Sequence, residues 1–306
     1  MSSLIEQAAR RLEQLRQAGV ELPGDHVAVE LGVRSEAAAA ALAAVVEEPK
    51  NLSKRVDLDL EALLAQGFLT PNAPRAQISD QYRVIKRPLI KNAMGKGAAI
   101  LNHANLIMIT SALAGEGKSF TSLNLALSIA AEMDNTVMLV DADVARPSVL
   151  RMLGLPAGPG LLDVLQGAVD MSDVLLRTNV DKLTLLPSGT PQARATELLA
   201  SDAMSATLDD MARRYPDRII IFDSPPLLLT TESRVLASHM GQIVVVVHAE
   251  KTPQSAVQQA LATIESCPLK MMLLNQTTTS SSGGYGYGYR YGYGYGYGYA
   301  DEAAKS

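Results

Sequence analysis

The sequence has no tryptophan, a single cysteine and only three phenylalanines among its 306 residues. The lone cysteine, Cys267, excludes a disulfide scaffold and a cysteine metal cluster, and it suits a reducing compartment. No apolar run reaches the roughly 18 residues that a membrane helix needs, and the N-terminus lacks the apolar core of a signal peptide. We therefore expect a cytoplasmic protein that reaches the inner membrane only through a partner.

Charged residues make up 19% of the chain and hydrophobic residues 47%. This composition supports a sizeable buried core and excludes global disorder. The formal net charge of −5 argues against a nucleic-acid partner, because such proteins carry an excess of basic residues.

Tyrosine is concentrated at one end of the chain. Only Tyr82 and Tyr215 lie in the body, so its core must be built from aliphatic side chains. The other eight tyrosines alternate with glycine near the C-terminus: Tyr285, Tyr287, Tyr289, Tyr291, Tyr293, Tyr295, Tyr297 and Tyr299. Such a tract cannot bury a core, and we expect residues 276–306 to form a flexible, disordered tail. In isolation, the tract is typical of a sticky, base-stacking low-complexity segment.

Residues 1–77 have the pattern of a helical extension followed by a linker. Amphipathic spacing predicts helices over about 1–18 and 35–48, and prolines punctuate residues 49–77, which also carry a short apolar helix near 58–66. The extension is either packed on the surface or mobile, or it docks a partner.

Residues 78–275 alternate between helical patterns and continuous apolar runs. Buried runs separated by helices predict an α/β domain of the P-loop NTPase type, with a mostly parallel sheet covered by helices on both faces. Strands are expected at 105–109, 136–140, 182–186, 218–222, 242–248 and 271–274, and helices at 78–93, 120–131, 160–165, 195–215 and 253–264.

A glycine-bearing loop between the first of these strands and the next helix predicts a nucleotide site. Glycines allow backbone N–H groups to surround phosphate oxygens at a helix N-terminus. Lys118 is then expected to contact the β- and γ-phosphates, and the Ser119 hydroxyl to coordinate Mg²⁺. The first glycine of the usual pattern is replaced by Ala112. The predicted nucleotide-binding residues are Ala114, Gly115, Glu116, Gly117, Lys118, Ser119 and Phe120.

Three aspartates follow two of the predicted strands. Asp141 and Asp143 end one strand, and Asp223 ends another. Carboxylates there can hold a Mg²⁺ shell and accept a proton from an attacking hydroxyl. A single such residue is as often a helix cap, but three after a phosphate loop favour a catalytic site.

Together, TSALAGEGKS, LVDADVARP, IIIFDSPP and the tyrosine cluster resemble the bacterial tyrosine kinases (BY-kinases). QYRVIKRPL and the N-terminal extension are similar to the exosortase-associated tyrosine autokinases of exopolysaccharide loci. The resemblance implies ATP and Mg²⁺ as cofactors and the eight tail tyrosines as phosphoacceptors. It assigns catalysis to Asp141, Lys118 and Asp143, and metal binding to Ser119, Asp141, Asp143 and Asp223.

The resemblance also implies a ring of subunits. Asp80, Arg83 and Lys86 occupy the positions of an E-x-x-R-x-x-R motif that packs such rings, although an ordinary charged helix face has the same appearance. Further implied partners are a membrane polysaccharide co-polymerase or chain-length determinant as activator, and a protein-tyrosine phosphatase.

Two other functions remain open at this point. A partitioning-type ATPase switch without tyrosine kinase activity shares the fold and the aspartates, but it carries a signature lysine where this chain has Leu113. A scaffold that binds nucleotide without catalysis would not need the full set of aspartates.

Overall fold

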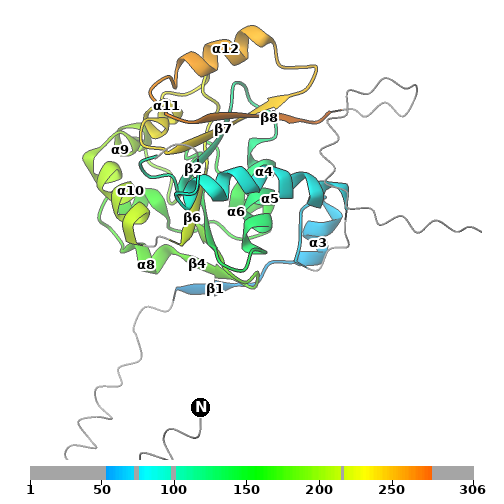
Figure 1. The fold of residues 1–306 in the computed structure, drawn as a ribbon. Helices are drawn as coiled ribbons and strands as arrows, with labels where there is room; N and C mark the ends of the chain where they lie inside the picture. Colours follow the sequence, from blue (N-terminus) through cyan, green and yellow to red (C-terminus); the bar gives the residue numbers. More distant parts are fainter. Residues whose placement is uncertain (1–52, 72–75, 98–100, 215–216, 278–306) are drawn as a thin grey trace, which may run out of the picture. The chain divides into compact units, whose positions relative to one another are not determined.

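The computed structural model describes residues 53–71, 76–97, 101–214 and 217–277 (Figure 1). All of them belong to one compact unit that begins at Ser53. The helices expected over 1–18 and 35–48 and the eight tail tyrosines lie outside the described residues.

The unit is built on an eight-stranded sheet with the strand order β1-β4-β5-β3-β6-β2-β7-β8. Every neighbouring pair is parallel except β4 and β5, which run antiparallel. The mostly parallel sheet predicted from the sequence is thus confirmed. The strands are β1 Lys54–Val56, β2 Leu106–Ser111, β3 Thr136–Asp141, β4 Leu176–Thr178, β5 Leu183–Leu186, β6 Arg218–Asp223, β7 Gln242–His248 and β8 Lys270–Asn275.

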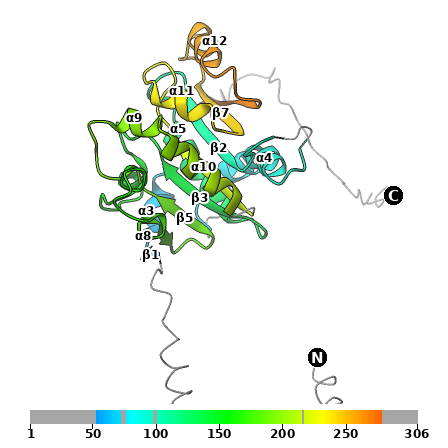
Figure 2. The same ribbon diagram turned by 90° about the vertical axis from the view of Figure 1, so that its left-hand side faces the viewer.

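Helices cover both faces of the sheet (Figures 1 and 2). They are α3 Leu60–Ala65, α4 Gln77–Ala93, α5 Lys118–Ala130, α6 Val149–Met152, α7 Leu161–Leu165, α8 Met171–Val174, α9 Ala195–Leu199, α10 Asp202–Arg214, α11 Glu232–Ala237 and α12 Gln254–Ala262. Within the described ranges, no helix is both long and apolar enough to cross a bilayer.

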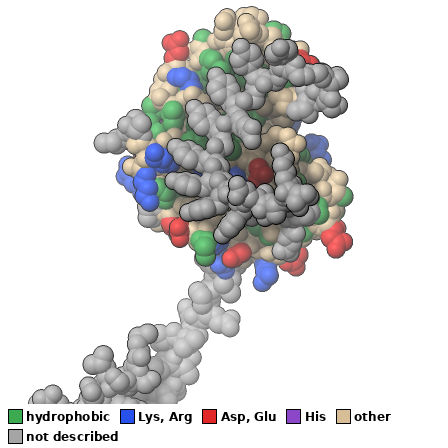
Figure 3. Space-filling model, turned by 45° about the vertical axis from the view of Figure 1, so that its right-hand side comes forward, with side chains coloured by type: hydrophobic (Ala, Val, Ile, Leu, Met, Phe, Trp, Pro, Cys, Tyr) green, Lys and Arg blue, Asp and Glu red, His purple; other side chains and the backbone are tan. Residues whose placement is uncertain are grey.

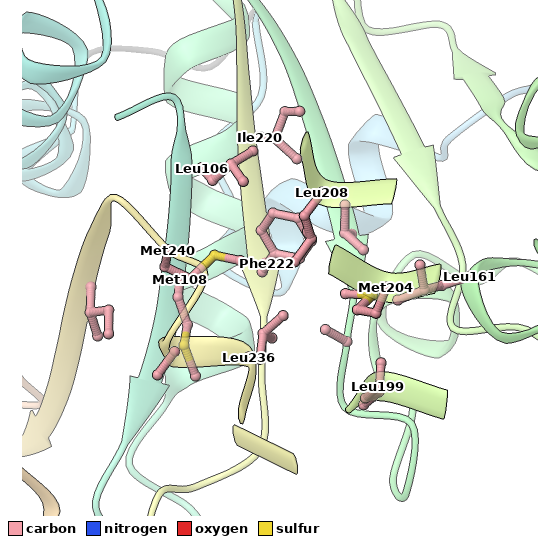
Figure 4. Close-up of a cluster of buried hydrophobic side chains, with 14 of the residues drawn as sticks. Leu106, Met108, Leu161, Leu199, Met204, Leu208, Ile220, Phe222, Leu236 and Met240 are labelled. Carbon is pink, nitrogen blue, oxygen red and sulfur yellow. The ribbon is translucent and has the colours of Figure 1, made fainter. Parts of the chain in front are cut away.

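Each face of the sheet has its own aliphatic core. Side chains alternate along a strand, so Met108 of β2 packs toward α10 and α11, whereas its neighbours Ile107 and Ile109 pack toward α4 and α5. Figure 4 shows the first core, where Phe222 lies among leucine and methionine side chains. Burial on both sides explains why these strands are apolar at every position.

The segment predicted to be a linker belongs to the domain. β1 pairs in parallel with β4, and Leu63 of α3 is 2% exposed within the second core. The side-chain amide of Asn179 binds both the N–H and the carbonyl of Leu58. The domain therefore starts at Ser53 rather than at residue 78. The strand β1 has three residues and begins with two charged ones, so it has no apolar pattern that predicts a strand. It is stabilised by β4, which lies about 120 residues further along the chain.

The helix expected over 195–215 is two helices. α9 ends at Leu199 and α10 starts at Asp202. The Ser201 hydroxyl accepts a hydrogen bond from the N–H of Met204 at 3.3 Å, which is the geometry of an N-terminal cap. The residues between Leu199 and Asp202 thus end one helix and cap the next.

Candidate active site

The phosphate loop joins the carboxyl end of β2 to the first turn of α5. Gly115 and Gly117 have φ angles of 84° and 92°, which side-chain-bearing residues rarely adopt. A Cβ at Gly117 would be strained by this φ, and it would lie 2.1 Å from Nδ2 of Asn275, so the Asn275 side chain would have to move. The Thr121 N–H donates to the Gly117 carbonyl at 2.9 Å and is the first of α5 to bond back into the loop, so the earlier N–H groups of the first helical turn have no partner within the helix. Unpaired N–H groups at a helix N-terminus form an anion site that suits phosphate.

The sheet brings two of the aspartates to the same edge as this loop. β6 lies between β2 and β3, and Asp141 on β3 is directly opposite Asp223 on β6. Asp223 is in turn opposite Ile109 of β2, two residues before the end of that strand. The order of the strands thus places both carboxylates beside the phosphate loop.

Side chains from three segments contact one another at this edge. Lys118 Nζ lies 2.8 Å from Asp143 Oδ2 in a largely buried ion pair. The Ser148 hydroxyl, in the loop after β3, donates to Ser119 Oγ at 3.0 Å and to Asp223 Oδ2 at 3.4 Å. The structure thus brings together the loop lysine, its following serine and the aspartates.

Asp141 is almost fully enclosed. Its Oδ2 accepts hydrogen bonds from the N–H groups of Ser148 and Val149, each at 2.9 Å, whereas its Oδ1 is buried with no partner. Burial, reinforced by the negative charge of Asp223, raises the pKa of Asp141 to about 7. Burial also raises the pKa of Asp223, against the opposing effect of Lys118. Carboxylates held this way are typical of sites that bind a cation or take up a proton.

Comparison of the sequence with known proteins shows which family the chain belongs to. The AAA domain family matches residues 104–277. The tyrosine-protein kinase YwqD of Bacillus subtilis (strain 168) is 30% identical over 209 residues, covering 68% of this chain and 84% of the relative. The chain belongs to the bacterial protein-tyrosine kinases. It is therefore a protein-tyrosine kinase of the P-loop type.

Two further matches describe the extent of the likeness. The tyrosine kinase ptk of Acinetobacter johnsonii is 34% identical over 167 residues, which is 55% of this chain but 22% of that protein. The crystal structure of the VpsO kinase domain has 28% identity and a TM-score of 0.53, and it covers 66% of this chain and all of that domain. The shared part is thus the kinase domain itself.

The polar groups of the kinase suit a magnesium–nucleotide complex. In the described part of the chain, no three carboxylate, imidazole or thiol groups gather into a protein-only cation site. Mg²⁺ bound to a nucleotide needs few protein ligands, because phosphate oxygens and waters fill its octahedral shell. The Ser119 hydroxyl and the buried, unpartnered Oδ1 of Asp141 fit that requirement.

The Glu116 side chain turns away from the anion site, although the residue is in the predicted nucleotide-binding set. It is 3% exposed, and its carboxylate accepts hydrogen bonds from the Leu113 N–H at 2.6 Å and from the Thr252 hydroxyl. A carboxylate pointing at ATP would repel the phosphates, so only the backbone of Glu116 is suited to contact them.

The sequence analysis did not predict that Ser148 belongs to the site. Its one signal was its position directly after LVDADVARP, but serine after proline is common in loops. Only the tertiary structure shows its hydroxyl between Ser119 and Asp223.

The three residues predicted to contact other subunits do not behave alike. Asp80 and Arg83 form an exposed ion pair of 2.7 Å on α4. Lys86 instead points inward, where its ammonium binds the Ser128 carbonyl at 2.5 Å and the Glu132 carboxylate at 2.7 Å. A lysine at the C-terminal end of α5 neutralises unpaired carbonyls there. Lys86 therefore serves the contact between α4 and α5 within the chain.

Proposed function

We propose that this kinase is an ATP-dependent autokinase that phosphorylates the tyrosines of its own C-terminal tail. The supporting observation is the enclosed carboxylate of Asp141, whose Oδ1 lacks a partner at the sheet edge that also carries the phosphate loop. A tyrosine hydroxyl placed there would donate its proton to Oδ1 while its oxygen attacks the γ-phosphorus of ATP, and ADP leaves.

The loop residues have separate tasks in this proposal. The N–H groups of residues 114–120 hold the phosphates, and Lys118 exchanges Asp143 for the β- and γ-phosphate oxygens. Ser119, Asp141, Asp143 and Asp223 are the side chains that would hold Mg²⁺, directly or through water. When bound, Mg²⁺ neutralises charge on the phosphates.

The acceptor is proposed to come from a neighbouring subunit. The chain beyond Asn275 has roughly 30 residues, and a glycine-rich coil of that length has a root-mean-square reach on the order of 30 Å. The exposed pair Asp80 and Arg83 is available for contacts between subunits of a ring, whereas the buried Lys86 is not. Each phosphate would add about −1.5 to −2 charges to the tail, so repulsion between modified tails would favour dissociation of the ring.

The resemblance to the autokinases of exopolysaccharide loci extends the proposal to physiology. The kinase would regulate the synthesis or export of an exopolysaccharide. A membrane co-polymerase would activate it, and a protein-tyrosine phosphatase would reverse its modification.

One mixing experiment tests whether the kinase phosphorylates its tail and whether one subunit phosphorylates the tail of another. Full-length Lys118→Met is incubated with Mg-ATP and with wild-type kinase shortened to residues 1–277, which lacks all eight tail tyrosines. We expect anti-phosphotyrosine signal on the full-length band in the mixture and none with either protein alone. Asp210→Asn, an exposed substitution on α10, is the control for an unchanged wild-type signal.

The other outcomes have distinct meanings. Signal on Lys118→Met alone would contradict catalysis at this loop. Signal in full-length wild type but none in the mixture would mean that the tail is modified within its own subunit. ATP hydrolysis without any phosphotyrosine would instead favour the partitioning-type ATPase.

A further inference from the structure

Glu116 is an acidic residue in the one loop that has to bind a polyanion. Its carboxylate is buried, and among the described residues no ion pair includes it. Burying an unpaired charge is unfavourable unless hydrogen bonds compensate for it. A carboxylate kept here must therefore be held by its neighbours for a specific task.

Both of its oxygens are occupied, and each bond leads to a different segment. Oε2 accepts the N–H of Leu113 at 2.6 Å, which closes the beginning of the phosphate loop on itself. Oε1 accepts the hydroxyl of Thr252, which lies in the turn between β7 and α12. Thr252 Oγ1 is itself fixed, since it accepts the N–H of His248 at 3.2 Å.

The backbone of the same residue is tied to a third segment. The Asn275 side chain, at the end of β8, donates to the Glu116 carbonyl at 3.0 Å. The loop is thus anchored to the ends of two strands that take no part in the predicted motifs. The phosphate loop has two residues with positive φ angles and lacks the repeating backbone hydrogen bonds of a helix or strand. Contacts with neighbouring segments are therefore needed to keep it in one conformation.

We propose that Glu116 and Thr252 form a positioning pair for the phosphate loop. Their hydrogen bond holds the N–H groups of residues 114–120 in the arrangement that receives the phosphates of ATP. The inference rests on the proposed nucleotide binding at this loop, and it adds to that proposal a link from the loop to the turn before α12. Because the Glu116 carboxylate is occupied by the Leu113 N–H and the Thr252 hydroxyl, the pair would act on nucleotide binding through the shape of the loop rather than on the transfer step.

The test is a comparison of nucleotide binding in Thr252→Val and Thr252→Ser. Valine keeps the shape of threonine without its hydroxyl, and serine keeps the hydroxyl. Thr207→Val on α10 removes a hydroxyl that binds the carbonyl of Ala203 in the same helix and is the matched control. Titration of the full chain with a fluorescent ATP analogue gives the dissociation constant, and autophosphorylation gives KM and kcat.

We expect Thr252→Val to weaken binding and raise the KM for ATP about tenfold, the effect of losing one hydrogen bond to a charged group. The value of kcat should stay within about twofold, because Lys118, Asp141 and Asp143 are untouched. Thr252→Ser and Thr207→Val should bind like wild type. Glu116→Ala should show the same loss and, without nucleotide, faster hydrogen exchange at the Leu113 amide.

Three results would overturn the pair. Unchanged binding in Thr252→Val and Glu116→Ala would show that the loop holds its conformation without it. An equal loss in Thr252→Ser would assign the effect to packing of the methyl group. A fall in kcat at constant KM would place the pair in catalysis. Failure of the wild type to bind the ATP analogue would instead contradict the proposed function. The titration of the wild-type protein measures that binding independently of the variants.

Discussion

Lys118 Nζ and Asp143 Oδ2 lie 2.8 Å apart, and the two side chains are only 13% and 7% exposed. The lysine of the phosphate loop is thus neutralised by one of the kinase's own aspartates. In the proposed reaction, the ammonium would exchange this carboxylate for phosphate oxygens of ATP.

This pairing predicts a stability effect that nucleotide reverses. Asp143→Asn leaves a buried ammonium without its counter-ion, which costs about 3 kcal/mol of unfolding free energy. ATP should then stabilise Asp143→Asn more than it stabilises the wild type, because the phosphates replace the lost charge. Thermal unfolding with and without ATP measures both effects, with Asp57→Asn on the exposed surface as control. Equal stability of Asp143→Asn and wild type would contradict the prediction.

The raised pKa of Asp141, about 7 against 3.8 for a free aspartate, predicts a pH-dependent gain in stability for Asp141→Asn. Between about pH 4 and pH 7 the folded protein holds a proton that the unfolded chain releases, so the free energy of unfolding falls as the pH rises through this window. The neutral asparagine escapes that penalty, which amounts to at most about 4 kcal/mol above pH 7.

Chemical denaturation without Mg²⁺ and nucleotide checks this prediction. Asp141→Asn should unfold at higher urea concentration than wild type at pH 8, and the difference should shrink toward pH 4. The same variant should give no phosphotyrosine. A gain that is equal at both pH values would rule out titration of Asp141 as its cause.

The inward position of Lys86 predicts that its loss affects folding. Lys86→Met keeps the aliphatic stem and removes the ammonium from Ser128 and Glu132, which should lower the unfolding free energy by about 2 kcal/mol. Arg83→Met, on the exposed side of the same helix, should leave stability within about 0.5 kcal/mol. Unfolding curves measure stability, and sedimentation velocity measures assembly. Full stability of Lys86→Met together with loss of oligomers would return Lys86 to the subunit contacts.

The extended domain boundary predicts that the segment before residue 78 contributes to the core. Leu63→Ala should cost about 2–5 kcal/mol, because Leu63 is 2% exposed in the core beneath α4 and α5. Its neighbour Leu64 is 44% exposed, and Leu64→Ala should cost less than about 1 kcal/mol. If the two variants unfold at the same denaturant concentration, residues 53–71 are not part of the folded unit.

Features encoded by adjacent residues could be predicted from the sequence. The apolar runs gave the strands β3, β6 and β7 to within a residue, since burial on both faces requires continuous apolar side chains. The phosphate loop and the aspartates could be predicted together because parallel strands bring their carboxyl ends to one edge. The short strand β1, in contrast, depends on a pairing with β4 that no local pattern encodes.

The sequence by itself determined the class of the sheet, the phosphate loop, the three aspartates and, through them, the kinase family. These features depend on residue type and short spacing, which local chemistry specifies. The tertiary structure alone decided the directions of individual side chains. Glu116 faces Thr252, Lys86 faces the end of α5, and Ser148 lies between Ser119 and Asp223. Those directions depend on partners that are distant in the chain and become neighbours only when the sheet is assembled.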